Sequence, residues 1–182
     1  MKPQTLGWLG IVRLGLVQSA LGAIVVLATS TLNRVMQVEL ALPAIVPGVL
    51  VGLHYAVQVS RPRMGYGSDT GGKRTPWIIG GMAVLAAGGV AAALATALMA
   101  SHLAAGLVLA AVAYLAIGAG VSATGTTLLV LLAKSTAEDQ KAISATVVWL
   151  MMIAGFAITA VCAGKALDPF SSRRLVEVTS VV

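Results

Sequence analysis

The sequence predicts an all-α protein whose helices cross a membrane several times. Of its 182 residues, 58% are hydrophobic and only 10% are charged, and the mean hydropathy is +0.95. Water-soluble domains carry about 25% charged residues, so the composition excludes that class. Only 4% of the residues are aromatic and 20 are glycine, which favours helices that pack closely through small side chains.

Five apolar stretches have the length of about 20 residues that crosses a hydrocarbon core of about 30 Å. The predicted spans are residues 14–32, 40–59, 77–100, 103–133 and 142–163. Lys2 and Arg13 precede the first stretch, and the absence of a small-residue cleavage site after it favours a span over a signal peptide.

Two of these spans carry further local signals. Pro43 and Pro47 in the second span predict a bend, because proline removes a helix hydrogen bond. The fourth stretch is longer than one untilted crossing needs, so we expect its end near residues 128–133 to form an interfacial turn.

Residues 164–182 predict a tail on the outer side of the membrane. Asp168-Pro169 interrupts the helical pattern, and Arg173 and Arg174 are expected to anchor the chain at the interface. The sequence becomes apolar again from Leu175 onward, which predicts the start of a sixth span. The whole of 1–182 is therefore expected to form one transmembrane helical domain.

The distribution of basic residues predicts a cytoplasmic N-terminus. With that orientation, eight basic residues lie on the cytoplasmic side and four on the other, as the positive-inside rule requires. The eight are Lys2, Arg13, Arg61, Arg63, Lys73, Arg74, Lys134 and Lys141, and the four are Arg34, Lys165, Arg173 and Arg174. Because this charge is divided among short membrane-flanking loops, we expect no nucleic-acid partner.

The polar content of the spans argues against an ion-coupled pump and against an enzyme. All six acidic residues fall in predicted loops or at span ends, whereas proton-coupled carriers usually place a carboxylate within a span. Two histidines and one cysteine cannot assemble a multi-ligand metal cluster or a Ser-His-Asp set, so no catalytic residues are assigned.

A small set of side chains is a candidate for contact with a pigment. His54 lies near the end of the second span with Gln58 four residues on, and a neutral imidazole there could bind the magnesium of a chlorophyll-type pigment. The alternative is a histidine that only makes structural hydrogen bonds. Trp149 and Met152 belong to a bulky patch in the fifth span that suits either a flat macrocycle or another helix.

The segment from Arg61 to Trp77 reads RPRMGYGSDTGGKRTPW and predicts a tight cytoplasmic turn. Its four glycines allow left-handed backbone conformations. Asp69 is placed to cap a helix or to pair with Lys73 or Arg74, and Pro76 is expected to open the third span.

The order Gly-x-x-x-Asp-x-x-Gly-Lys-Arg in this segment resembles the signature loop between helices two and three of the major facilitator superfamily. The resemblance implies a lock between neighbouring helices on the cytoplasmic side, formed by Gly65, Asp69, Gly72, Lys73 and Arg74. Thr70 stands where that family usually has a basic residue, which argues against a transport function.

A wider resemblance covers residues 31–82, 137–158 and 168–175 and includes Asn33-Arg34, Glu39, His54 and the string from Gly71 to Trp77. These segments resemble the PucC/LhaA family of photosynthetic bacteria, relatives of the major facilitators. The resemblance implies the N-terminal half of a fold of about twelve spans. It further implies a bacterial inner (intracytoplasmic) membrane protein that assembles light-harvesting antenna complexes.

The implied ligands are bacteriochlorophyll and carotenoid, and with them Tyr55 and Trp77 join His54, Trp149 and Met152 as candidate pigment contacts. The implied partners are antenna polypeptides, lipid and the photosynthetic reaction-centre complex. Two alternatives stay open: a small-molecule transporter of the major facilitator type, or a structural subunit of a photosynthetic supercomplex.

Overall fold

The computed structural model describes residues 6–71 and 73–182, and within them every regular element is a helix. The first helix is α1 (Trp8–Val26), which continues through a π-helical turn (Leu27–Thr31), α2 (Leu32–Arg34) and a second π-helical turn (Val35–Glu39). Next come α3 (Ile45–Val57), a 3-10 turn (Gln58–Ser60) and α4 (Arg61–Thr70). The remaining helices are α5 (Thr75–Met99), α6 (Leu103–Ser135), α7 (Lys141–Ala166) and α8 (Ser172–Val181).

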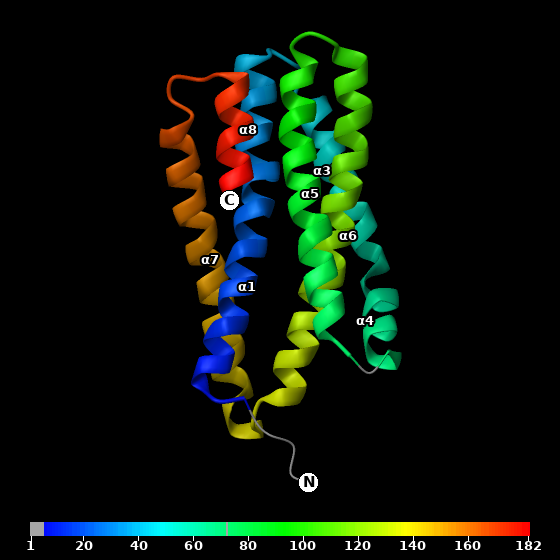
Figure 1. Cartoon of the computed structure of the whole chain (residues 1–182), viewed down its shortest axis with the longest axis vertical. Helices are drawn as coiled ribbons and strands as arrows, with labels where there is room; N and C mark the ends of the chain where they lie inside the picture. Colours follow the sequence, from blue (N-terminus) through cyan, green and yellow to red (C-terminus); the bar gives the residue numbers. More distant parts are fainter. Residues whose placement is uncertain (1–5, 72) are drawn as a thin grey trace.

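The helices form an up-and-down bundle with alternating directions (Figure 1). The chain rises in α1, descends through α3 and α4, rises in α5, descends in α6, rises in α7 and turns down again in α8 (Figure 1). The most extensive packing joins α5 to α6 and α1 to α7, while α3 and α4 lie against α6. The helices therefore bring residues far apart in the sequence to the same level of the bundle.

The α5–α6 contact depends on glycine. A Cβ atom placed on Gly120 would lie 2.7 Å from both Gly81 O and Leu85 N, so these two backbones approach too closely for any larger residue. Such contacts between small residues are the usual way in which membrane helices associate. The neighbouring core contains Leu85, Ile117 and Tyr114, all fully buried.

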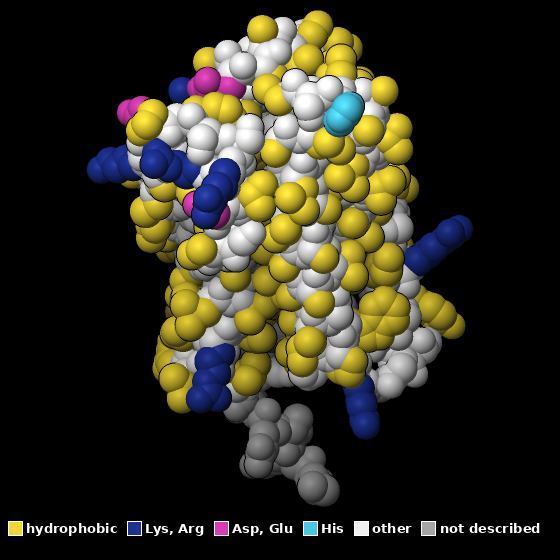
Figure 2. Space-filling model, turned by 45° about the horizontal axis from the view of Figure 1, so that its top comes forward, with side chains coloured by type: hydrophobic (Ala, Val, Ile, Leu, Met, Phe, Trp, Pro, Cys, Tyr) yellow, Lys and Arg dark blue, Asp and Glu magenta, His cyan; other side chains and the backbone are white. Residues whose placement is uncertain are grey.

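Four helices are long and apolar enough to cross a membrane: Trp8–Glu39, Thr75–Met99, Leu103–Ser135 and Glu138–Ala166. They confirm the polytopic all-α class and correspond to four of the five predicted spans, of which 77–100 extends one residue beyond its helix. Figure 2 shows hydrophobic side chains over the whole height of the face in view, with Lys and Arg side chains toward its upper left, its right edge and its lower end. This distribution suits a chain surrounded by lipid.

The second predicted span, 40–59, is wrong in its extent. Glu39 still belongs to the first long helix, and α3 has only 13 residues, from Ile45 to Val57. The proline bend is also wrong, because Pro43 precedes the helix and Pro47 lies in its first turn, where the ring clashes with no preceding turn. The regular helix is instead interrupted at Gln58–Ser60 by the 3-10 turn.

Two further details of the prediction are corrected by the structure. The end of the fourth span does not form an interfacial turn, since α6 continues as one helix of 33 residues to Ser135. Much of the expected tight turn is the helix α4, and Gly71 after it has a φ of −73°, which any residue adopts. Pro76 opens α5 as predicted. The predicted break before the last segment is also present, because α8 begins at Ser172, and the Ser171 side chain accepts a hydrogen bond from the Arg174 N–H.

Candidate functional site

A cavity of about 290 Å³ lies between α1, α3, α6 and α7 and contains four of the five predicted pigment contacts. We call it the His54 cavity and define it by Gln18, His54, Tyr55, Gln58, Trp149 and Met152. Most of its other wall residues are apolar, among them Leu21 of α1, Val121 of α6 and Phe156 of α7. His54 and Trp149, 95 positions apart, thus line one cavity, because α3 packs against α6, α7 packs against α1, and α6 contacts both α1 and α7.

A chain of hydrogen bonds fixes the His54 ring. The Arg61 guanidinium donates to Gln58 Oε1, which turns the Gln58 amide nitrogen toward His54 Nε2 at 2.8 Å. Since that nitrogen can only donate, His54 Nε2 accepts, and this network assigns the ring proton to Nδ1. The His54 side chain is buried, and Nδ1 has no hydrogen-bond partner among the described residues.

Gln18 of α1 lines the cavity and carries a second unpaired polar atom. Its Nε2 donates to Met152 Sδ at 3.3 Å, whereas its Oε1 is buried without a partner in the described part of the chain. A buried polar atom left unpaired costs about 1–3 kcal/mol. Sequence reasoning missed Gln18, although an amide alone in the apolar run of the first helix is a usable signal.

The aromatic wall of the cavity is partly open. Tyr55 and Trp149 are 57% and 47% exposed, and the Tyr55 ring meets the His54 ring edge-on with centroids 4.8 Å apart. The exposed Arg61 lies at the cavity rim. The arrangement therefore combines flat apolar walls with one buried N–H donor, one buried carbonyl acceptor and a positive charge at the edge.

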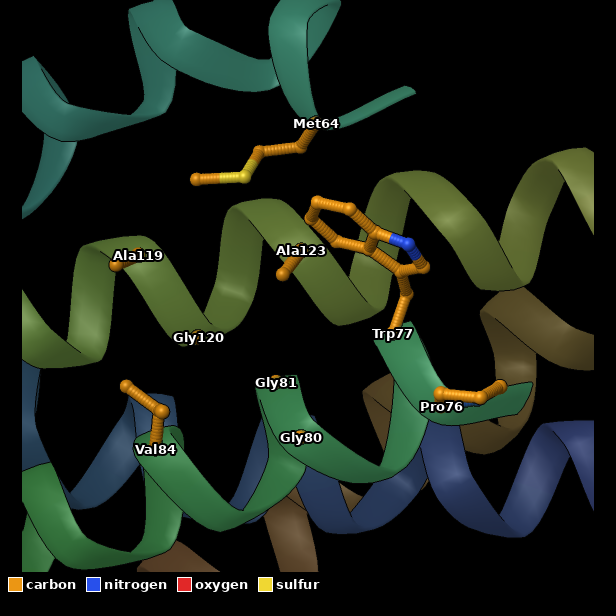
Figure 3. Close-up of a pocket in the computed structure, with 9 residues that line it drawn as sticks. All are labelled: Met64, Pro76, Trp77, Gly80, Gly81, Val84, Ala119, Gly120 and Ala123. Carbon is orange, nitrogen blue, oxygen red and sulfur yellow. The ribbon is translucent and has the colours of Figure 1, made fainter. Parts of the chain in front are cut away.

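Trp77, the fifth predicted contact, lies elsewhere. Together with Gly80, Gly81, Val84, Gly120 and Ala123 it lines a separate hollow of about 370 Å³ between α5 and α6, which we call the Trp77 groove (Figure 3). Met64 of α4 also lines this groove (Figure 3). Gly67 of α4 also lies against the indole, since a Cβ there would be 2.9 Å from the ring.

Asp69 links three segments at one end of the bundle. Its Oδ1 accepts a hydrogen bond from the Arg74 guanidinium and one of 3.2 Å from Lys134 Nζ at the end of α6. Hydrogen bonds from Arg74 first and Lys134 second hold the pKa of the Asp69 carboxyl below its usual range. Sequence reasoning named Arg74 but missed Lys134 as a partner, although its place at the end of the fourth predicted span puts it on the side of Asp69.

The other residues of the predicted lock have different surroundings. Gly65 allows α4 to approach α6, because a Cβ there would lie 3.3 Å from Thr126 Cγ2. Lys73 is exposed and lines a hollow with Arg74 and Thr75. Gly72 lies outside the described residues. Within residues 6–71 and 73–182, the structure has no group of three or more His, Cys, Asp or Glu side chains that could hold a metal ion.

Comparison with known proteins gives a consistent set of relatives. The family described as PUCC protein matches residues 31–182. The chain is 54% identical over 178 residues, 98% of its length, to the bacteriochlorophyll synthase 44.5 kDa chain of Rhodobacter capsulatus. It is 30% identical over 94% of its length to Protein PucC of Cereibacter sphaeroides, and 32% identical over 92% of its length to Protein PucC of Rhodobacter capsulatus.

These alignments cover 42%, 40% and 39% of the three relatives, so the chain spans about two fifths of the length of the proteins it matches. No solved structure matches the chain.

Proposed function

The chain belongs to the PUCC protein family, and on that premise we propose that it is a membrane assembly factor for bacterial light-harvesting antenna complexes. Its place in this family and the names of its relatives indicate a membrane protein related to photosynthesis. The proposed role is to hold bacteriochlorophyll at the His54 cavity while apolar helix faces contact antenna polypeptides. The proposed location is the bacterial inner membrane, with the N-terminus in the cytoplasm. The photosynthetic reaction-centre complex is proposed as a further partner.

The observation that supports this proposal is the convergence of His54, Tyr55, Trp149 and Met152 on one cavity beside two unpaired buried polar atoms. The cavity is slightly smaller than the range of about 300–1,000 Å³ usual for ligand pockets. It therefore fits the edge of a macrocycle, with the rest of the pigment against the exposed faces of Tyr55 and Trp149. A carotenoid, being long and flexible, would use the same aromatic faces.

The role of His54 follows from its hydrogen bonds. Because Arg61 donates to Gln58 Oε1, the Gln58 amide N–H points to His54 Nε2, which accepts. The ring proton is therefore on Nδ1, which is a donor. A hydrogen bond to a peripheral carbonyl of the pigment matches that state directly. Binding of magnesium would require Gln58 to reorient, because its amide N–H occupies the Nε2 lone pair, and the Nδ1 lone pair becomes free only if the ring proton moves to Nε2. Neither Nδ1 nor Gln18 Oε1 is exposed, so contact with a ligand requires a side-chain shift at the cavity wall.

We propose a binding role and no catalysis, although one relative is named as a chain of bacteriochlorophyll synthase. Bacteriochlorophyll supplies its own chemistry when bound. The residues of this chain position it, exclude water and match its polar groups. Asp69, Arg74 and Lys134 are proposed to hold α4, α5 and α6 together at the cytoplasmic end, with Gly65, Gly72 and Lys73 completing that lock.

The proposal is tested by purifying the protein in mild detergent from a pigment-producing host. We expect near-infrared bacteriochlorophyll bands at a fixed ratio to protein, together with antenna polypeptides. His54→Ala should reduce the bands, whereas His102→Ala, an exposed residue before α6, should leave them unchanged. A colourless preparation without antenna polypeptides would contradict the proposal.

A further inference from the structure

The Trp77 groove opens beside a cluster of basic side chains. A second hollow lined by Lys73, Arg74, Thr75 and Ile79 shares Pro76 and Gly80 with the groove. The two hollows are therefore adjacent along the first turns of α5. One has charged groups on its wall, and the other is lined by apolar side chains and glycine.

The charge at this end is strongly unbalanced. Lys73, Arg74 and Lys134 contribute three positive charges, and the one carboxylate that pairs with them is Asp69, which binds both Arg74 and Lys134. Lys73 has no ion pair with any described residue. Arg74 Nε is buried and has no hydrogen-bond partner within the described chain. This end of the groove therefore complements an anion.

The groove has the dimensions of a lipid chain in one leaflet. From Pro76 to Val84 the helix α5 rises about 12 Å, at about 1.5 Å per residue. One leaflet of hydrocarbon is about 15 Å thick. The floor consists of Gly80 and Gly81 on α5 and Gly120 and Ala123 on α6, with the Trp77 indole at the end near the basic residues (Figure 3).

We propose that the Trp77 groove binds an anionic phospholipid, with an acyl chain along Gly80 and Val84 and its phosphate beside Lys73 and Arg74. Basic pockets between membrane helices are suited to anionic headgroups, and tryptophan is suited to the boundary between headgroup and chain. The site is separate from the His54 cavity and does not depend on the assembly function.

Gly80 makes this site testable without disturbing the bundle. A Cβ on Gly80 would meet nothing within 4 Å, so Gly80→Leu fills the groove while the backbone contacts stay in place. Gly52 of α3 is the matched control, because its Cβ position is equally open and it does not line the groove. Lys73→Gln removes charge at the headgroup end and leaves the groove unfilled.

The measurement uses Trp77 as the only tryptophan, in a Trp8→Phe, Trp149→Phe background. Phosphatidylglycerol and phosphatidylcholine with brominated acyl chains are titrated into the detergent-solubilised protein, since bromine quenches a tryptophan that it contacts. We expect phosphatidylglycerol to quench Trp77 at a several-fold lower mole fraction than phosphatidylcholine. Gly80→Leu should weaken quenching by both lipids, Gly52→Leu should change neither, and Lys73→Gln should reduce the preference for phosphatidylglycerol.

Three results would overturn the proposal. Equal quenching by the two lipids would show that the basic end does not select an anionic headgroup. Unchanged quenching in a Gly80→Leu protein that melts like the parent would show that the chain lies elsewhere. Absence of quenching by either lipid in the parent protein would leave the groove to a different occupant, such as a helix of a partner.

Discussion

Lys134 Nζ lies 3.2 Å from Asp69 Oδ1, which joins the end of α6 to the last turn of α4. Asp69 also binds Arg74 at the start of α5, so one carboxylate connects three helices. Thr70, beside Asp69, stands where the major facilitator loop that this segment resembles usually has a basic residue. Lys134 of α6 is therefore the second cation, after Arg74, that pairs with Asp69.

Asp69→Asn should lower the melting temperature at neutral pH by a small amount, because both ion pairs are partly exposed. The pKa of Asp69 is lowered in the folded state, so its contribution to stability is complete above its unfolded value of 3.8. The contribution is lost as the pH falls through the lower folded-state pKa. Melting curves by circular dichroism should therefore differ between wild type and variant at pH 7 and converge under strongly acidic conditions. A difference that grew on acidification would contradict this account.

Tyr114→Phe should destabilise the bundle by about 1 kcal/mol. The fully buried Tyr114 hydroxyl donates to Ala28 O at 2.6 Å, in the π-helical turn that follows α1. Equilibrium unfolding in mixed detergent micelles measures the difference in free energy of unfolding between the variant and the wild type. Tyr66→Phe, at a side chain that is 73% exposed, is the control and should have no effect.

Gly120→Ala should destabilise the protein by about 1–3 kcal/mol, since the added methyl group would meet the α5 backbone at 2.7 Å. Gly80→Ala should be neutral or stabilising by up to about 1 kcal/mol, because its site is open and alanine favours a helix. Unfolding in mixed detergent micelles compares the free energies of unfolding of the Gly120→Ala and Gly80→Ala variants. Equal losses would show that α5 and α6 do not pack as described.

Gln18→Leu should have opposite effects on stability and binding. Without pigment the variant should be more stable by about 1 kcal/mol, because it removes the unpaired buried Oε1. It should also bind bacteriochlorophyll more weakly, because it removes the buried acceptor from the cavity. Unfolding of the pigment-free protein and the pigment content after purification measure the two effects. A variant less stable without pigment would show that Gln18 is a structural residue.

Hydropathy was sufficient to predict the four long helices, because about 20 consecutive apolar residues have few alternatives to a membrane span. It misplaced the second span, since Leu40 to Ala44 are as apolar as the helix that follows them. The segment Arg61–Thr70 was predicted as a turn from its glycines. Its helix is explained by packing, because Gly65 and Gly67 allow close contact with Thr126 and Trp77.

Four cavity residues were predicted one by one from their chemistry, but their convergence was not. The meeting of α3 with α7 around α1 and α6 depends on tertiary packing, which the hydropathy pattern does not contain. For the same reason Trp77 was grouped with His54, although it lies in a different groove. Gln18 and Lys134 were missed as site residues because their partners are distant in the sequence.

The central claim, that the His54 cavity binds pigment, is tested most directly by titrating bacteriochlorophyll into a protein whose only tryptophan is Trp149. Gly125 lines the cavity, and a Cβ there would have one neighbour, Leu21 Cδ1, at an ordinary 3.8 Å, so Gly125→Leu places its side chain in the cavity with no clash at Cβ. We expect saturable quenching of Trp149 that Gly125→Leu weakens about tenfold, equivalent to about 1.4 kcal/mol, and that Gly52→Leu leaves unchanged. Equal quenching in the parent and in Gly125→Leu would contradict the claim.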